Sequence, residues 1–500
     1  MSILSFEFIF FFALVIISYY LVPIRWRWVH LLLSSIIFYG LISLPYLFLI
    51  IILTVIDFFI AKGFVLEKFK NRKKILLVSG LTANVLVLIF FKYVNPIYEF
   101  TQGIFIGSVS SEINPLFKIV IPLGISYYIF KKISYLVDVY RGIQYPEKNV
   151  AKLLLYVLFF PEITAGPIDR STHLITQFNP KKEYDHQQIL RGIQLILWGL
   201  FKKLVIADRL ALLVNPVYNH PAHFNGPHFI LATIFFSIQI YCDFSGYTDI
   251  VIGIGHTLGY RLMDNFNRPY FSKSISEFWT RWHISLSKWL RDYLFLPLAY
   301  SASRKIKEEK VLNISAESLS YSFGVLVTMS ICGLWHGADS TFLFWGLLHG
   351  LYLTVSFFTR KMRKKIKRTL KINRFQGFDH FLRRIFCFSL VTFSWIFFRA
   401  NSLGDGFSIV GKIFKWGGNA VDRSGVSKNF INGISFSDLV VVLLAIFLLF
   451  MVELLQPRIK FGTLILSRPP WQRWLIYYGI IFFILFFGVF ESDVFIYEGF

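Results

Sequence analysis

Runs of mainly apolar residues recur along this 500-residue chain, and they constrain its fold more than any other feature. An apolar run of about 20 residues crosses the hydrocarbon core of a bilayer as one α-helix. Charged residues make up only 16% of the sequence, whereas soluble domains carry about 25%. We therefore expect an all-α polytopic membrane protein with about 11–13 transmembrane helices. The candidate runs are residues 3–22, 28–43, 44–61, 75–92, 117–137, 190–206, 228–242, 320–334, 340–358, 382–398, 436–455 and 474–490.

We expect residues 1–500 to form one integral-membrane domain, with N-terminal helices in 1–116, a core in 117–360 and C-terminal helices in 361–500. Two further apolar stretches are interrupted: residues 151–168 by proline and glycine, and residues 247–260 by glycine. Irregular backbone at membrane depth is tolerated only inside protein or beside a water-filled cavity. These two stretches are therefore expected to be re-entrant or cavity-lining rather than lipid-facing.

The net charge of +23 gives the expected orientation in the membrane. Its basic residues cluster between apolar runs, a pattern typical of cytoplasmic loops and not of a nucleic-acid-binding surface. Residues 360–374 hold nine Lys and Arg, whereas residues 93–116 hold none. The positive-inside rule then places the N-terminus outside, with the first helix retained and not cleaved as a signal peptide. We therefore expect the chain to contact the lipid bilayer and to have no nucleic-acid partner.

The sequence lacks the usual signatures of metal and serine chemistry. Its three cysteines, Cys242, Cys332 and Cys387, lie in or beside apolar stretches and form no CxxC pair, so we expect small buried side chains. No His/Cys/Asp cluster has zinc-ligand spacing, and no G-x-S-x-G motif marks a nucleophilic serine. We expect no metal site and no bound cofactor.

Three polar clusters stand among these apolar runs, and ionisable residues inside a membrane often mark a functional site. The first covers residues 239–249, where Asp243 and Asp249 close an apolar helix, together with residues 264–270, which include Asn265. The alternative for each of these residues is an ordinary polar loop with a helix cap.

The second cluster, within residues 276–297, is expected to form an interfacial amphipathic helix with Trp and basic residues at the headgroup level. Its periodic face comprises Phe278, Trp282, Ser285, Trp289, Asp292 and Leu296, with Arg281, Lys288 and Arg291 on another side. A membrane-surface brace explains most of this pattern, but not His283 on its Trp-rich part.

The third cluster is Gly333-Leu-Trp-His-Gly337, at the end of an apolar span. A histidine at a helix end is often structural, but burial favours neutral imidazole, the form that accepts a proton from an alcohol. We take His336 and His283 as catalytic candidates. The candidates for substrate binding from the three clusters are Trp335, Trp282, Arg281, Ser285, Asp243, Asn265 and Asp292.

Ordered motifs in these clusters resemble the membrane-bound O-acyltransferase (MBOAT) family, in particular its alginate O-acetyltransferase branch. The matching segments are 278–294, 333–339, 241–249, 265–270, 165–168 and the aromatic ending 495–500. The likeness spans roughly 120–500; Thr280 and the Glu498-Gly499 pair depart from the pattern.

The resemblance implies a ring of tilted helices around a thin centre with a tunnel through it. The two family histidines correspond to His336 and His283. It also implies transfer of an acetyl group from a cytoplasmic thioester, expected to be acetyl-CoA, to an extracytoplasmic polysaccharide in the bacterial inner membrane, with an extracytoplasmic acetyltransferase partner. His336 would act as a general base or hold the acyl group briefly, while His283 would orient or polarise.

Two alternatives remain open from the sequence alone. Related branches with similar motifs transfer D-alanine to teichoic acids, so another acyl group or cell-envelope polymer fits as well. A transporter or channel would also place ionisable residues among many spans, although no pair of matching broken helices marks two inverted halves.

The orientation is tested by single cysteines introduced at Ser108 and Thr369. The cysteine at 108 should react from outside with a membrane-impermeant thiol reagent, and the cysteine at 369 should not, because the first lies in a loop without basic residues and the second in the most basic loop. The reverse pattern would overturn the orientation.

Overall fold

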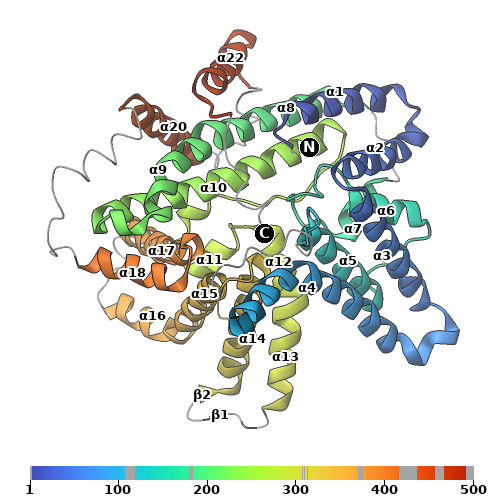
Figure 1. The fold of residues 1–500 in the computed structure, drawn as a ribbon, viewed down its shortest axis with the longest axis horizontal. Helices are drawn as coiled ribbons and strands as arrows, with labels where there is room; N and C mark the ends of the chain where they lie inside the picture. The colour runs from blue at the N-terminus through green and yellow to red at the C-terminus, as the bar shows by residue number, and fades with distance from the viewer. Residues whose placement is uncertain are drawn as a thin grey trace. The chain divides into compact units, whose positions relative to one another are not determined.

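Helices make up most of the computed structural model, which describes residues 3–106, 119–178, 184–306, 308, 310–311, 314–369, 376–415, 436–455, 465 and 467–490 (Figure 1). Within these residues the strands are β1 (Lys310–Val311) and β2 (Ile314–Ser315), which form one short antiparallel hairpin. The all-α prediction is confirmed. Ser108, residues 416–435 and the ending 495–500 lie outside the described residues.

The chain divides into two compact units. The first comprises Met1–Ile196 and Val251–Met263, and the second comprises Leu197–Ile250 and Asp264–Phe500. Helices of the first unit are α1 (Phe6–Leu21), α2 (Arg27–Ile42), α3 (Leu44–Gly63), α4 (Lys73–Ile106), α5 (Ile125–Tyr140), α6 (Val150–Leu158) and α7 (Ser171–Leu174). Two helices contribute to both units, α8 (His186–Leu200) and α10 (Gly226–Thr257).

The second unit holds the polar clusters that the sequence singles out. Its helices are α9 (Asp208–Asn219), α11 (Ile275–Trp279), α12 (Ile284–Leu290), α13 (Leu296–Lys305), α14 (Ala316–His336), α15 (Ser340–Phe358), α16 (Arg360–Thr369), α17 (Gln376–Arg399), α18 (Leu403–Phe414), α20 (Phe436–Leu455) and α22 (Pro470–Phe487). Two π-helical segments, Phe201–Ala207 and Arg291–Phe295, continue α8 and α12.

Eight described helices are long and apolar enough to cross a membrane: α3, α4, α10, α14, α15, α17, α20 and α22. The candidate runs at 3–22, 28–43 and 117–137 correspond to helices α1, α2 and α5, which have only 16 residues each. The run at 190–206 corresponds to the 15-residue α8 and the π-helical segment that continues it. Helix α5 begins late because Pro122 precedes Gly124, whose φ of 73° is not helical. The polytopic helical architecture is therefore as expected, with several helices shorter than a full span.

The two interrupted stretches behave differently. Helix α6 ends at Leu158, and the irregular backbone that follows is buried through Asp169, as expected for such backbone inside protein. The expectation of irregular backbone at 247–260 is wrong, because α10 continues to Thr257. These residues are nearly all buried, so the expectation that they do not face lipid is confirmed. Gly253 fits a close helix contact there, since an added Cβ would lie 2.6 Å from the Gly192 carbonyl oxygen.

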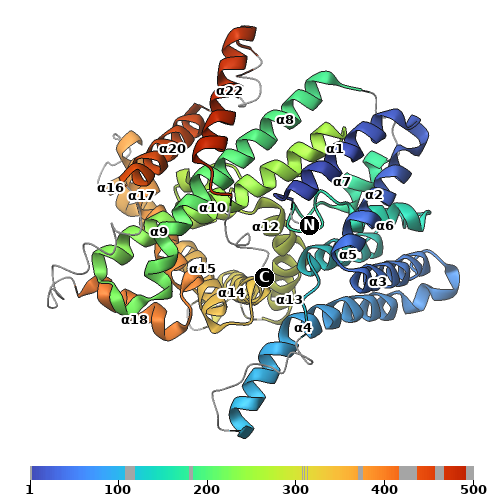
Figure 2. The ribbon, with the colours of Figure 1, turned by 45° about the horizontal axis from the view of Figure 1, so that its top comes forward.

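Glycines also allow close backbone contact within the second unit. A Cβ added to Gly199 of α8 would lie 2.5 Å from the carbonyl oxygen of Gly246 in α10. Helices α14 and α15 run side by side (Figures 1 and 2). A Cβ on Gly346 would lie 2.2 Å from the Met329 carbonyl oxygen. Small residues at such contacts let helices approach closely in a membrane, where the hydrophobic effect does not drive them together.

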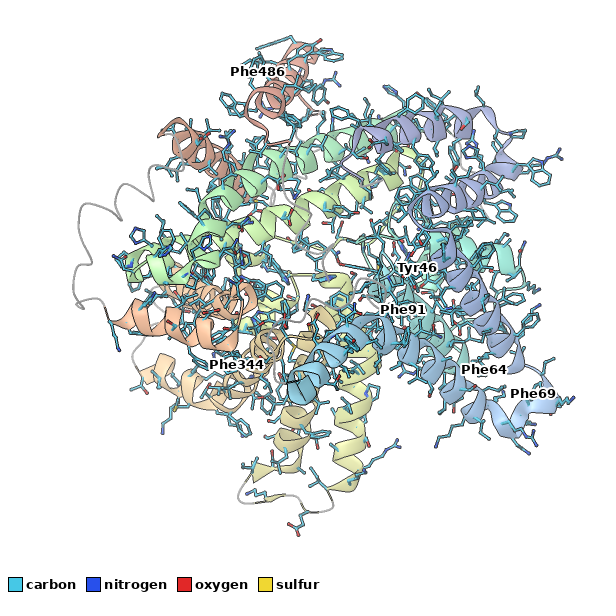
Figure 3. The ribbon with its side chains drawn as sticks, in the orientation of Figure 1. Tyr46, Phe64, Phe69, Phe91, Phe344 and Phe486 are labelled. Atoms are coloured by element: carbon cyan, nitrogen blue, oxygen red, sulfur yellow. The ribbon has the colours of Figure 1, made fainter. Side chains whose placement is uncertain are left out.

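Aromatic rings contribute to helix contacts and also lie on outward faces (Figure 3). In the first unit, Tyr46 of α3 packs edge-on against Phe91 of α4, with ring centroids 5.5 Å apart. In the second, Phe344 of α15 lies 4.5 Å from Phe397 of α17, centroid to centroid. Phe486 of α22 is instead 67% exposed, as expected for a side chain that faces lipid.

The glycine contact between α8 and α10 predicts a selective loss of stability. Gly199→Ala should lower the thermal unfolding midpoint of the purified protein, because the new methyl group forces the two backbones apart at a cost of about 1–3 kcal/mol. Gly479→Ala is the matched control in α22, where an added Cβ meets nothing within 4 Å. Equal midpoints for the two variants would contradict this account of the contact.

Candidate active site

A break between helices α11 and α12 positions His283. The prediction of one amphipathic helix over 276–297 is wrong: α11 ends at Trp279, and His283, with a φ of 42°, starts α12 from the left-handed region. The backbone N–H of Ile284 donates to the Asn265 carbonyl oxygen, 2.9 Å away. Hydrogen bonds to a neighbouring loop therefore replace bonds of a continuous helix at this turn.

The tryptophans of this segment pack inside the protein. Trp279, Trp282 and Trp289 are at most 9% exposed, so they pack against protein and do not face the lipid headgroups as expected. Residues 282, 283, 285, 286, 289 and 290 are buried and Lys288 is exposed, so the periodic face is present but packs against protein. The aromatic core around Trp282, which includes Phe266 at 5.1 Å and Trp395 at 5.2 Å between centroids, explains the burial.

Asn265 fixes the protonation of His283. The Ser285 backbone N–H and the Ser285 hydroxyl donate to one Asn265 side-chain atom at 3.2 and 2.6 Å. Because a backbone N–H can only donate, this atom is the amide oxygen Oδ1. His283 Nδ1 lies 3.4 Å from the same oxygen, and two acceptors would repel each other. Nδ1 therefore carries the hydrogen, and Nε2 keeps its lone pair.

The lone pair on His283 Nε2 is buried and available. The residue is 1% exposed, and no described residue offers a hydrogen bond to Nε2. Burial lowers the pKa of the His283 imidazole to about 3, so the ring is neutral at physiological pH. A neutral imidazole with a free lone pair accepts a hydrogen bond or a proton from a hydroxyl group.

His336 lies in the same cluster of rings. It is the last residue of α14 and is 2% exposed. The Trp335 ring contacts both histidines, with centroids 4.8 Å from His336 and 6.1 Å from His283. A Cβ at Gly337 would lie 2.4 Å from the Phe342 ring, so only glycine lets α15 begin so close to this helix end. The structure thus brings His283, Trp335 and His336 together.

His349 is a third buried histidine near this cluster, and it has the hydrogen-bond partners expected of a structural residue. The Trp279 indole N–H, which can only donate, lies 3.3 Å from His349 Nδ1, and His349 Nε2 lies 2.9 Å from the Ser394 hydroxyl. Both ring nitrogens are therefore satisfied. The sequence signal for this residue is a single histidine in the middle of an apolar span, four residues after Trp345.

The charged candidates point to other partners. Asp243 pairs with Lys203 at 2.7 Å, Asp292 with Arg291 at 2.8 Å, and Arg281 with Glu277 at 2.6 Å. Their roles in substrate binding stay predictions.

Buried ion pairs also correct the expected end of α10. Asp243 and Asp249 lie inside this helix rather than at its end, because Lys203 and Lys202 of the π-helical segment compensate their charges at 2.7 and 2.6 Å. Sequence analysis missed both lysines and Glu453, which accepts a hydrogen bond from the Tyr241 hydroxyl. A carboxylate within the apolar run 436–455 was the available signal for Glu453.

The described residues contain no group of three or more His, Cys, Asp or Glu side chains placed to hold a metal ion. The three cysteines are free and buried, as expected for small apolar side chains.

Comparisons with known proteins agree on one family. The model described as "MBOAT, membrane-bound O-acyltransferase family" matches residues 146–398. A protein named "Probable alginate O-acetylase AlgI" from Azotobacter vinelandii is 35% identical over 80% of this chain and 75% of its own length. The "Peptidoglycan O-acetyltransferase" of Helicobacter pylori is 31% identical over 76% of this chain and 72% of its own. The "Teichoic acid D-alanyltransferase" of Bacillus subtilis is 31% identical over 53% and 70%.

The role of Asn265 predicts a large effect from one small change. Asn265→Ala should destabilise the protein by about 2 kcal/mol or more, because it leaves two buried Ser285 donors and His283 Nδ1–H without their acceptor. Asn267→Ala, in the same loop but exposed, is the matched control. Both are compared by thermal unfolding in detergent, and unchanged stability of Asn265→Ala would refute the assigned hydrogen-bond network.

Proposed function

Because this chain belongs to the membrane-bound O-acyltransferase family, we propose that it moves an acetyl group across a bacterial inner membrane for O-acetylation of an extracytoplasmic polysaccharide. Family membership makes the chain an acyltransferase and removes the transporter alternative as its main activity. The donor is a cytoplasmic acetyl thioester, acetyl-CoA, and an extracytoplasmic acetyltransferase partner completes the transfer. The N-terminus lies outside, as the distribution of basic residues favours.

One observation carries the chemistry: the buried pair of histidines around Trp335, with a lone pair available on His283 Nε2. His336 takes the proton of an incoming hydroxyl group while His283 Nε2 accepts a hydrogen bond that orients it. The hydroxyl oxygen then bonds to the thioester carbonyl carbon, the carbon–sulfur bond breaks, and the proton passes to the leaving thiolate. Positioning of the two reactants supplies much of the rate, and general-base help adds about 10²–10⁴-fold.

The similar proteins favour acetyl over D-alanyl as the acyl group that is transferred. Those named for O-acetyl transfer cover 76–80% of this chain in the two comparisons above, whereas the named D-alanyltransferase covers 53%. Radioactive acetyl-CoA supplied to proteoliposomes tests the donor. Label transferred to the acceptor system supports the proposal, while transfer seen only with D-alanyl thioester would replace acetyl with D-alanyl.

We expect substitutions at the two histidines to leave different amounts of acetyl-transfer activity. His336→Asn should abolish acetyl transfer, because asparagine keeps hydrogen bonding but cannot accept the proton. His283→Ala should lose most of it and retain measurable turnover, since an orienting role is partly replaceable. Turnover of acetyl-CoA by the purified protein with its acceptor system gives the measurement.

His349→Asn is the matched control for these variants, because both nitrogens of that buried ring already serve structural partners. We expect it to lower thermal stability more than it lowers turnover per folded molecule. Gel filtration gives the folded fraction of each variant. Full turnover in folded His336→Asn would return that residue to a structural role.

A further inference from the structure

Helix α16 carries a dense positive charge at the end of a candidate membrane span. Its residues, Arg360–Thr369, include seven Lys and Arg, and no acidic residue stands between Asp339 and Asp379 in the sequence. Only Thr359 separates α16 from α15, which has 19 residues and an apolar composition suited to crossing a bilayer. Because about 20 residues span the hydrocarbon core, α16 begins at the membrane surface.

One arginine ties α16 to the end of α15. The guanidinium Nη2 of Arg363 donates to the backbone carbonyl oxygen of Ser356 and, at 3.0 Å, to the Ser356 hydroxyl oxygen. The last four carbonyl groups of an α-helix have no partner within the helix, so Arg363 supplies a donor to one of them. The basic helix is therefore fastened to the membrane span and does not hang from a flexible linker.

The apolar residues of α16 form an exposed stripe beside a row of lysines. Met362 and Ile366 are four residues apart and so lie on one face of the helix, where they are 56% and 45% exposed. Lys361 and Lys365 each precede one member of this pair and flank the stripe on one side. Lys364 lies two residues from both apolar side chains, which places it on the opposite face, because each residue turns the helix by about 100°.

The charge of this helix is not neutralised by the part of the chain that the structure describes. No ion pair there joins a side chain of α16 to a carboxylate. The next acidic residue along the chain, Asp379, pairs with Arg383 on its own helix at 3.0 Å. The exposed lysines and arginines are therefore available to an anionic partner outside the chain.

We propose that α16 lies on the cytoplasmic surface of the membrane and binds the headgroups of anionic phospholipids. Lys361, Lys365 and Arg368 contact the headgroup phosphates, while Met362 and Ile366 insert between the lipids. Basic segments next to a membrane span are attracted to anionic lipids, and stable attachment to a bilayer takes an apolar and a basic signal together. Both signals are present here. This inference goes beyond the proposed function and does not rest on it.

The composition of this face favours lipid over an acidic protein as the partner. A stable protein interface buries about 1,200–2,000 Å², and lysine is depleted in such interfaces. The exposed face of α16 offers two apolar side chains among lysines, which is too little apolar surface for an interface of that size. Its place at the end of α15 puts the same face beside lipid headgroups.

The first test places an environment-sensitive fluorophore on the full-length chain in lipid nanodiscs. A nitrobenzoxadiazole label on Met362→Cys should shift its emission to the blue when phosphatidylglycerol replaces part of the phosphatidylcholine, because the apolar face then enters the bilayer. The same label on Lys364→Cys, on the opposite face, should report water in both kinds of nanodisc. The three native cysteines are buried, and wild-type protein treated with the label gives the background.

The second test removes two charges from either face of α16. Lys361→Gln combined with Lys365→Gln should lower the preference for phosphatidylglycerol over phosphatidylcholine about fivefold or more, which is the loss expected for at least one basic residue at an anionic surface. Arg360→Gln combined with Lys364→Gln removes the same charge from the opposite face and should change the preference by less than about twofold, since the attraction falls off with distance from the surface. Quenching of the label at 362 by nitroxide-labelled lipids measures the preference.

Two results would overturn the proposal. Equal losses in the two double variants would show attraction to positive charge in general and not a lipid-binding face. Identical emission of the label at 362 with and without phosphatidylglycerol would exclude insertion and leave the charge of α16 to a soluble acidic partner. Neither result bears on acetyl transfer, so the proposed function is tested separately.

Discussion

Two backbone hydrogen bonds between the 264–271 loop and the turn before α12 determine the rest of the candidate site. Ile284 N–H to the Asn265 carbonyl and Asn267 N–H to the Arg281 carbonyl, both 2.9 Å long, hold the turn outside a helical conformation. The same loop supplies the amide that sets the His283 tautomer. The chemistry of the imidazole therefore depends on how two short segments pair, and not on His283 alone.

The energetic cost of the His283 environment is clear from a comparison with the nearby His349. His349 has a partner on each nitrogen, whereas His283 has one only on Nδ1 among the described residues. A buried polar atom without a partner costs about 1–3 kcal/mol. A catalytic role is one explanation for such an atom, and this difference is the physical basis for proposing a functional role for His283 and a structural role for His349.

Much of the architecture was predictable, because apolar runs and basic loops follow directly from the cost of placing charges in lipid. The motif around His336 was also predictable, since Gly337 and the end of an apolar run mark a helix end. The break at His283 was not, because residues 276–297 keep helical periodicity and only the tertiary bonds to Asn265 interrupt it. The buried lysine–aspartate pairs were missed for the same reason: their partners lie 40 or more residues apart in the sequence.

The glycine contact between α8 and α10 limits how this family member can change in length. Because Gly199 meets the Gly246 carbonyl with no side chain in between, the contact exists in one rotational register. One inserted residue turns the rest of a helix by about 100°, which would replace glycine with the next side chain and move Lys202 and Lys203 away from their aspartates. Insertions are therefore tolerated only in the loops. The buried lysine–aspartate pairs hold the two helices in this register.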